Sequence, residues 1–214
     1  MTLIAETPMV VIRQISVSDM DNDVYLLTHK ISGEQVLIDA ANDIDAIEGL
    51  LVQARGDAPQ TSLKLVITTH QHSDHVQALA YMAGKAGVIT AAGRRDVPGI
   101  KAETGVAIDV PLDNDAVIGV EGITLKVIGL RGHTQGSVAL AYAENGNPVH
   151  LFTGDSLFPG GVGNTNSDPV RFQSLLTDVI ARIFDVYDDD AVVHPGHGKP
   201  TTLGAERPQL PQWR

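Results

Sequence analysis

The sequence predicts an α+β fold in which two mixed β-sheets pack face to face and helices cover their outer surfaces, a four-layer αββα sandwich. Hairpin signals dominate the early part of the chain, whereas helices alternate with strands only later. This order favours two mixed sheets over one doubly wound parallel sheet. No linker or low-complexity stretch divides the 214 residues, so we expect a single domain over residues 1–214.

The first half of the chain supplies most strands of one expected sheet. Three β-rich segments are typical of strands, with a Ser-Gly-Glu turn between the last two: residues 10–15, 24–29 and 35–38. Two short apolar runs are typical of strands buried on both faces: residues 63–69 and 88–91. Two helices are expected in the same half: residues 44–54, after the capping candidates Asn42 and Asp43, and residues 75–86.

The second half combines two hairpins with one long helix. Each hairpin joins two strands through a glycine-containing turn: residues 116–120 with 123–130, and residues 138–142 with 149–152. Asp168-Pro169 opens a helix whose apolar stripe runs from Phe172 to Ile183 and is expected to face the core. Residues 191–194 form the last expected strand, and residues 208–214 are expected to be irregular.

The composition excludes several classes of function. The net charge of −11 argues against a nucleic-acid or anionic-membrane partner, since both need a concentrated basic face and only the pair Arg94-Arg95 interrupts the acidic character. The lack of cysteine removes disulfides, thiolate metal ligands and cysteine nucleophiles. No basic leader precedes an apolar stretch, and no apolar run approaches the ~20 residues of a membrane span. We therefore expect a cytoplasmic protein without a nucleic-acid or membrane partner, and the oligomeric state stays open.

Residues 68–75 hold the most informative pattern, a His-x-His-x-Asp-His motif directly after an apolar strand. If the strand conformation continues, His70, His72 and Asp74 point to one side, because side chains alternate with a period of two. His75 then points elsewhere as the helix begins. Four metal-capable groups that leave one strand end in two directions suit two adjacent ions better than one.

This pattern resembles that of the metallo-β-lactamase-fold hydrolases, most closely their glyoxalase II-like branch, the hydroxyacylglutathione hydrolases. The resemblance covers nearly the whole chain through six segments in order: Asp21-Asn22, Leu37-Ile38-Asp39, the histidine motif, Gly132-His133-Thr134, Thr153-Gly154-Asp155 and Gly196-His197-Gly198. It implies the αββα fold of that family and two metal sites that share one carboxylate. The implied ligands are His70, His72 and His133 for the first ion, Asp74, His75 and His197 for the second, and Asp155 for both.

The residues themselves agree with that assignment. His133, Asp155 and His197 each follow an expected strand beside a glycine, where the backbone can turn and present a side chain at the rim of a sheet. Imidazole and carboxylate ligands without thiolate suit zinc, iron or manganese, so we expect two divalent transition-metal ions, with zinc favoured. A shared carboxylate offsets the repulsion between two cations held ~3.5–4 Å apart. The glycine-rich residues 159–165 follow Asp155 closely and are expected at the rim of the site.

Other residues near the motifs have expected supporting or structural roles. Asp39 ends a strand near the site and is a candidate to orient a ligand histidine, and Asn22 is a weaker candidate of the same kind. His194, three residues before His197, either supports the site in the same way or serves packing, and the packing role is favoured. His29 and His150 lie inside expected strands and are interpreted as structural.

The expected reaction follows from a water shared by two ions. Its pKa falls from ~15.7 to near ~7, so hydroxide is available without a dedicated base, and one ion can polarise a substrate carbonyl. A thiol with a pKa of ~8.5 leaves as thiolate, whereas an amide nitrogen needs an acid that this pattern does not supply. The favoured function is therefore hydrolysis of a small-molecule thioester to a carboxylate and a thiol. Asp155 and Asp74 are the candidate catalytic residues, Asp155 as bridging ligand and Asp74 as a ligand able to shuttle a proton.

Two alternatives share the same residues. The persulfide dioxygenases have this fold and motif but use one iron on two histidines and a carboxylate, which here would be His70, His133 and Asp155. A lactonase or another ester hydrolase of the same fold is the closer competitor. Full-length glyoxalase II proteins also carry a C-terminal helical extension with basic residues that hold the glutathione carboxylates. Here only three cations follow the last histidine: Lys199, Arg207 and Arg214. The thiol half of the substrate therefore stays open.

Overall fold

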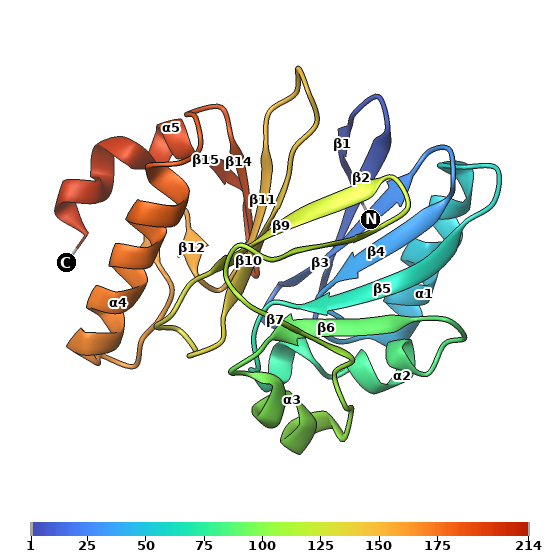
Figure 1. The fold of residues 1–214 in the computed structure, drawn as a ribbon, viewed down its shortest axis with the longest axis horizontal. Coiled ribbons are helices and arrows are strands. Elements are labelled where there is room, and N and C mark those ends of the chain that lie inside the picture. The colour runs from blue at the N-terminus through green and yellow to red at the C-terminus, as the bar shows by residue number, and fades with distance from the viewer. Residues whose placement is uncertain (1, 214) are drawn as a thin grey trace.

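Two mixed β-sheets, stacked face to face and flanked by helices on both outer sides, make up the computed structural model, which describes residues 2–213 (Figure 1). Helices α1 (Ile44–Gln53), α2 (Leu79–Ala83) and α3 (Val97–Thr104) lie on one side, and α4 (Pro169–Val179) and α5 (Leu203–Glu206) lie on the other. The predicted αββα sandwich is therefore confirmed. No helix within residues 2–213 combines the length and the apolar character needed to cross a bilayer.

The first sheet begins as a series of hairpins and ends as a parallel sheet. Its seven strands lie in chain order: β1 (Thr2–Glu6), β2 (Val10–Val17), β3 (Asn22–His29), β4 (Glu34–Ile38), β5 (Ser62–Thr68), β6 (Ile89–Gly93) and β7 (Val110–Leu112). Strands β1 to β4 pair antiparallel through short turns. Strands β4 to β7 pair parallel, because α1, α2 and α3 cross over between them.

The second sheet is built mainly from the later hairpins. Its order is β15-β14-β11-β10-β9-β8, from six strands: β8 (Val117–Val120), β9 (Ile123–Gly129), β10 (Val138–Tyr142), β11 (His150–Gly154), β14 (Val192–Pro195) and β15 (Thr201–Thr202). Both predicted hairpins, β8–β9 and β10–β11, are confirmed. Strand β14 pairs parallel with β11, because α4 and the π-helical turn Ile180–Phe184 cross over between them. A small separate hairpin of β12 (Leu157–Phe158) and β13 (Gly161–Val162) follows β11.

Three apolar clusters fill the spaces between the layers. The central cluster lies between the two sheets and includes Ile12, Leu27 and Phe152. The outer clusters lie between helices and sheets, with Leu50 of α1 over the first sheet and Leu175 of α4 over the second. Both leucines are fully buried, and burying one such side chain stabilises a fold by about 1.5–3 kcal/mol. The apolar stripe predicted for α4 therefore faces the core.

The chain segments that carry the candidate ligands meet at one edge of this sandwich. Four connections share the edge: those after β5, β11 and β14, and the one between β9 and β10. Backbone hydrogen bonds join them, from Val138 N to Thr69 O at 2.9 Å and from Gly196 N to Gly154 O at 2.9 Å. The two sheets thus hold these loops side by side although the chain separates them widely.

The structure corrects the sequence predictions in three places. The helix predicted over residues 75–86 is instead a 3-10 turn at Ser73–His75 followed by the short α2, because the amides of Gln77 and Ala78 bond to main-chain carbonyls just beyond β4. The sequence pattern did not indicate α3, whose Pro-Gly pair weakens its helical signal, nor the strands β1 and β7. The tail expected to be irregular, residues 208–214, instead lies mostly in a 3-10 helix at Arg207–Gln212, and Arg214 lies outside the described residues.

Candidate metal centre

Seven acidic and histidine side chains converge at this edge, and they are the seven that the sequence indicated as metal ligands. They form three overlapping groups, and within each group the potential ligand atoms all lie within 4.8 Å of one another. The groups are His70, His72 and His133; His70, His75 and Asp155; and Asp74, His75 and His197. Side chains from four connections of the fold therefore meet in one small volume.

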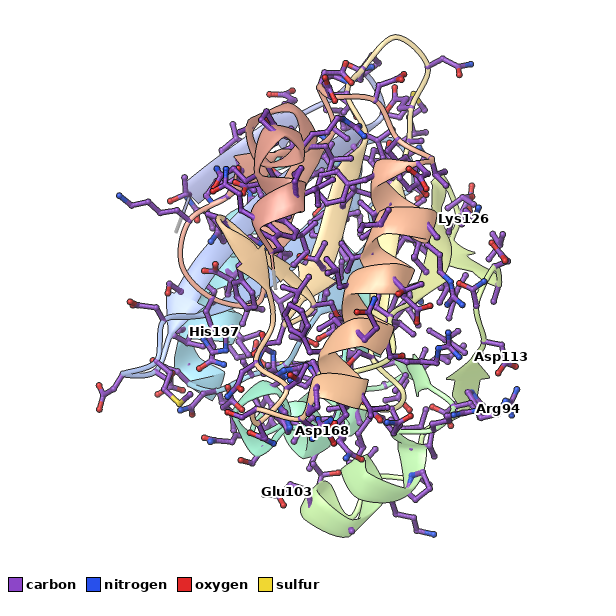
Figure 2. All side chains as sticks on the ribbon, turned by 90° about the vertical axis from the view of Figure 1, so that its left-hand side faces the viewer. Arg94, Glu103, Asp113, Lys126, Asp168 and His197 are labelled. Atoms are coloured by element: carbon purple, nitrogen blue, oxygen red, sulfur yellow. The ribbon has the colours of Figure 1, made fainter. Side chains whose placement is uncertain are left out.

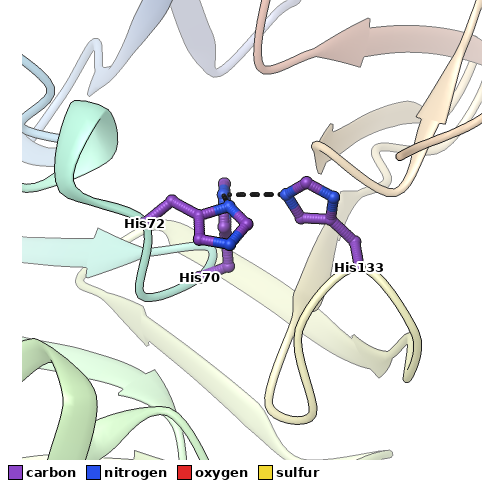
Figure 3. A group of neighbouring side chains, drawn as sticks. All are labelled: His70, His72 and His133. Atoms are coloured by element: carbon purple, nitrogen blue, oxygen red, sulfur yellow. Dashed lines mark hydrogen bonds between the residues drawn. The ribbon is translucent and has the colours of Figure 1, made fainter. Parts of the chain in front are cut away.

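The first group faces inward from two loops (Figure 3). His70 Nε2 lies 3.1 Å from His72 Nδ1 and 3.3 Å from His133 Nε2. His70 and His72 follow β5, whereas His133 approaches from the loop between β9 and β10. His70 and His133 are buried and His72 is partly exposed, so the group opens to solvent on the His72 side.

Asp74 lies with His75 rather than with His70 and His72, so the alternation expected from a continuing strand is wrong at this residue. The reason is local: β5 ends at Thr68, and Ser73–His75 form a 3-10 turn. The period of two therefore does not extend to Asp74. The division of the motif that the structure shows is the one that the family resemblance implied.

The second group lies beside the first. His75 Nε2 is 3.1 Å from His197 Nε2, and Asp74 Oδ2 is 3.3 Å from the same His197 nitrogen. Asn22 Nδ2 donates to Asp74 Oδ2 at 2.9 Å, and Asn22 also forms an isolated β-bridge with His197. The sequence indicated Asn22 only as a weaker candidate than Asp39 for orienting a ligand, and in the structure its amide binds Asp74.

Asp155 lies between the two histidine groups. Its Oδ2 is 3.5 Å from His133 Nε2 and 3.4 Å from His197 Nε2, and its Oδ1 is 3.3 Å from His75 Nε2. Gly154, with a φ of +48°, allows the turn at the end of β11 that directs this carboxylate inward. One carboxylate thus reaches both groups.

Hydrogen bonds on the far side of each ring decide which nitrogen faces the cluster. His133 Nδ1 lies 2.7 Å from the carbonyl oxygen of Asn164, and His197 Nδ1 lies 2.8 Å from that of Met20. A carbonyl oxygen can only accept, so each Nδ1 carries a proton. In the neutral ring, Nε2 then directs its lone pair at the cluster.

The same holds for the buried His70 and His75. His75 Nδ1 donates to Asp39 Oδ2 at 2.9 Å. The Thr69 hydroxyl donates to the same carboxylate oxygen, so the Thr69 oxygen accepts from His70 Nδ1 at 3.1 Å. Four imidazoles therefore present Nε2 to one volume, which is the usual arrangement of metal-binding histidines.

The donor atoms also have the spacing that a metal ion requires. Two nitrogen ligands at ~2.0–2.1 Å from a tetrahedral zinc ion are ~3.3–3.4 Å apart. The neighbouring donors here are 3.1 to 3.5 Å apart. Asp155 Oδ1 is buried and has no partner with hydrogen-bond geometry among residues 2–213, which is unfavourable for a carboxylate oxygen unless a cation lies beside it. The residues present therefore fit divalent ions with nitrogen and oxygen ligands.

The electrostatics around Asp155 favour positive charge on the side of His75 and His197, whereas burial lowers the pKa of His70 and His133. Burial acts to raise the pKa of Asp155, but the attraction of the neighbouring His197 and His75 imidazoles outweighs it and holds that pKa well below its usual range. Burial acts to lower the pKa of His75, but the neighbouring carboxylates of Asp155 and Asp39 raise it to about 10. The carboxylate therefore stays ionised and favours a positive charge beside it, which without a metal is a proton on His75 and with a metal bound would be the ion itself.

A comparison of the sequence with models of known protein families identifies the family of this chain. The model described as the metallo-beta-lactamase superfamily matches residues 18–197, most of the chain. The chain belongs to the metallo-beta-lactamase superfamily. The matched region ends at His197 and contains all seven candidate ligands.

Relatives of this superfamily member include hydroxyacylglutathione hydrolases. The hydroxyacylglutathione hydrolase GloC of Haemophilus influenzae is 29% identical over 164 residues, which cover 70% of this chain and 76% of GloC. The hydroxyacylglutathione hydrolase of Anaeromyxobacter dehalogenans is 31% identical over 179 residues, 83% of this chain and 61% of that protein. An uncharacterized protein of Mycobacterium tuberculosis is 40% identical over 101 residues, 46% of this chain and 45% of that protein. The matched region thus spans about half the length of several curated relatives.

Solved structures of superfamily members share the whole architecture. The BLEG-1 B3 metallo-beta-lactamase has a TM-score of 0.77 at 24% identity and covers 94% of this chain and 98% of its own. ETHE1 from Myxococcus xanthus has a TM-score of 0.77 at 21% identity and covers 94% of this chain and 83% of its own. TTHA1623, in a di-iron-bound form, has a TM-score of 0.71 at 28% identity and covers 91% of this chain and 96% of its own. The first two likenesses show the fold alone.

Two buried aspartates form hydrogen bonds with the loops that carry the candidate ligands of this superfamily member. Asp39, held at a φ of +57°, accepts from Thr69 N at 2.7 Å as well as from His75, which is the position proposed for it from the sequence. Asp96 accepts from the amides of Gln71 and Gly136 at 3.0 and 2.7 Å, and so ties the loop of His70 to the loop of His133. Sequence reasoning missed Asp96, because no motif surrounds it.

His194 lies away from the candidate ligands. Its Nε2 hydrogen-bonds His150 Nδ1 at 2.9 Å, and its ring stacks on Phe152 with the centroids 5.1 Å apart. This placement agrees with the packing role that the sequence favoured and not with direct support of a ligand. The glycine-rich loop, in contrast, lies at the rim as expected, since Asn164 O accepts from His133.

We expect His194 to make stability depend on pH. Burial, followed by the nearby His150, lowers the pKa of His194 from 6.5 to about 3. Below pH ~6.5 the unfolded chain binds a proton at this histidine and the folded protein does not. The free energy of unfolding therefore falls as the pH decreases from ~6.5 toward 3, by about 2 kcal/mol at pH 5. In metal-free protein, His194→Gln should reduce the difference in unfolding free energy between pH 7 and pH 5 by about that amount. Equal differences in urea titrations of both proteins would contradict the assignment.

We also expect a single methyl group at Gly196 to disturb the centre. A Cβ atom there would overlap Asp155 Oδ1 and lie 2.8 Å from His75 Cε1. Gly196→Ala should weaken metal binding by roughly 10–100-fold, measured by competition with a chelator. Gly56→Ala is the matched control, because a Cβ atom at Gly56 meets nothing within 4 Å. Similar affinities of the two variants would contradict this prediction.

Proposed function

We propose that this protein hydrolyses a thioester to a carboxylate and a thiol with two divalent transition-metal ions, zinc being favoured over iron and manganese. The family and its hydroxyacylglutathione hydrolase relatives make the coarser assignment, a metallo-β-lactamase-fold hydrolase. The observation that carries the finer proposal is the pair of ligand groups that share Asp155. TTHA1623, solved in a di-iron-bound form, supports a site for two ions.

The proposed ligands divide between two ions. His70, His72 and His133 would hold the first, Asp74, His75 and His197 the second, and Asp155 both. When bound, two such ions lower the pKa of a shared water to near ~7 and polarise a substrate carbonyl.

The chain itself fixes the protonation state of this site. Asp39 and the carbonyl oxygens of Met20 and Asn164 hold protons on Nδ1 of three histidines, which leaves each Nε2 free. Asp74 is partly exposed, and Asn22 bonds only its Oδ2. Its Oδ1 is therefore the group proposed to move a proton between the site and solvent.

The leaving group distinguishes a thioester from an amide. All seven acid–base groups of the cluster, Asp74 included, belong to the ligand groups, so no acid separate from the proposed ligands stands among them to protonate a departing nitrogen. A thiolate leaves without such an acid, because the pKa of a thiol is ~8.5. The named activity of the two hydroxyacylglutathione hydrolase relatives is consistent with this substrate class. The chain spans only part of the Anaeromyxobacter relative, so the thiol half of the substrate is not transferred from it.

The test combines metal analysis with paired substrates. We expect nearly two transition-metal ions per chain, and release of thiol from S-lactoylglutathione or from the same acyl group on another thiol. The matched amide should react at least about 100-fold more slowly, since it lacks an acid for its leaving group. A γ-lactone and a persulfide, the latter with an oxygen electrode, are assayed in parallel.

The possible outcomes separate the alternatives. Preferred turnover of the lactone would replace the thioester proposal by a lactonase. One iron per chain with oxygen uptake on the persulfide would replace it by a dioxygenase. Thiol release that requires two ions would support the proposal.

A further inference from the structure

Four of the nine arginines of this acidic protein line one pocket: Arg94, Arg95, Arg131 and Arg182. The sequence shows only Arg94-Arg95 as a basic pair, after β6. The fold adds Arg131, from the loop between β9 and β10, and Arg182, from the π-helical turn after α4. The cavity measures about 230 Å³, and no candidate metal ligand is among the residues that line it.

This arginine pocket is separate from the metal centre. Figure 2 shows Arg94 beside Asp113 on one flank of the molecule and His197 on the other, with α4 between them. The loop between β9 and β10 lies between the arginine pocket and the metal centre. Its residues Gln135 and Ser137 line the pocket, and its His133 faces the metal centre. A ligand in the pocket would therefore not occupy the proposed active site.

The four arginines of the pocket are only partly neutralised by neighbouring carboxylates. Arg94 pairs with the exposed Asp113, and Arg131 and Arg182 share the buried Asp178. Arg95 is exposed and makes no ion pair within residues 2–213. With these two aspartates counted against the four arginines, the formal charge is +2, in a chain whose net charge is −11.

Each paired guanidinium keeps a donor for a ligand. Arg94 and Arg131 bind their aspartates through Nε and Nη2, so Nη1 has no partner within the described part of the chain. Arg182 uses Nη1 on Gly129 O at 2.5 Å and Nη2 on Asp178, which leaves its Nε. Gly129 and Gly136 line the pocket without a side chain to fill it.

We propose that this pocket binds a phosphate dianion, either free or as a small phosphate monoester. The four guanidinium groups come from three separate segments, so their donors approach from several directions. A tetrahedral anion with three or more oxygens satisfies such donors, whereas one planar carboxylate is satisfied by a single arginine fork. The cavity of about 230 Å³ is below the ~300 Å³ at which pockets for drug-sized ligands begin, which favours a small anion.

Calorimetric titration of the metal-loaded protein with inorganic phosphate and with glycerol phosphate tests the proposal. We expect at least one of the two to bind with a dissociation constant below about 1 mM. Arg95→Glu should raise that constant about tenfold or more, since it replaces an unpaired cation by an anion. Arg55→Glu is the matched control, because Arg55 is exposed on another face and the change in charge is the same.

Phosphate can also bind at a metal centre, so the titration is repeated with Asp155→Asn. Binding that survives Asp155→Asn and is lost in Arg95→Glu supports the arginine pocket. Binding lost only in Asp155→Asn, or weakened equally by Arg55→Glu and Arg95→Glu, overturns the proposal. Malonate that binds as tightly as phosphate overturns the assignment to phosphate. The tighter of the two phosphates identifies the source of the dianion.

Discussion

Asp155→Asn is expected to reduce the bound metal from nearly two ions per chain to one or fewer and to lower thioester hydrolysis by roughly 10³-fold. Asparagine keeps the shape of the side chain but removes the negative charge that lies 3.3 to 3.5 Å from three imidazole nitrogens. Two cations would then lack the carboxylate that offsets their repulsion. Metal content by mass spectrometry and kcat/KM for the thioester measure the two effects.

Asp185→Asn is the control for this experiment. Asp185 is exposed at the end of the π-helical turn, and the substitution makes the same change in charge. We expect it to leave metal content and activity unchanged. An Asp155→Asn protein that still holds two ions would show that this carboxylate does not bridge them.

His72→Ala is expected to remove one ion and roughly 10³-fold of the activity while the fold keeps its stability. His72 is partly exposed, and its ring lies against those of His70 and His133. Little packing is therefore lost with it. The melting temperature of the metal-free protein should change by less than about 3 °C.

His150→Ala is expected to have the opposite effects. His150 is buried and bonds His194, so its loss leaves a buried imidazole nitrogen unpaired and costs about 1–3 kcal/mol of stability. The metal content should stay near two ions per chain, because neither histidine contacts the centre. Comparable losses of metal in His72→Ala and His150→Ala would contradict the ligand assignment.

The sequence predicted the layers and most of the strands because local signals mark them. The structure confirms the turn predicted at Glu121-Gly122 and the apolar stripe predicted for α4. It did not predict α3 or the course of residues 73–78, where hydrogen bonds to a distant segment replace those of a regular element. Tertiary contacts of this kind have no signature in a window of neighbouring residues.

The candidate site was predicted in its ligands and in one orienting group, Asp39, but most of the groups that orient the ligands were not predicted. His70, His72 and their partners lie in a dense motif or beside glycines at strand ends. The orienting groups that the sequence did not indicate are an isolated aspartate, Asp96, and two main-chain carbonyls, those of Met20 and Asn164. A carbonyl belongs to every residue type, so no choice of amino acid reveals it.

The use of main-chain carbonyls at Met20 and Asn164 has an evolutionary consequence. Any amino acid at either position offers the same acceptor, provided that the path of the backbone is kept. The loops around the candidate metal centre can therefore vary in side chain, and acquire new substrate preferences, without disturbing the tautomers of His197 and His133. Shortening or lengthening these loops is the kind of change that such a design tolerates least.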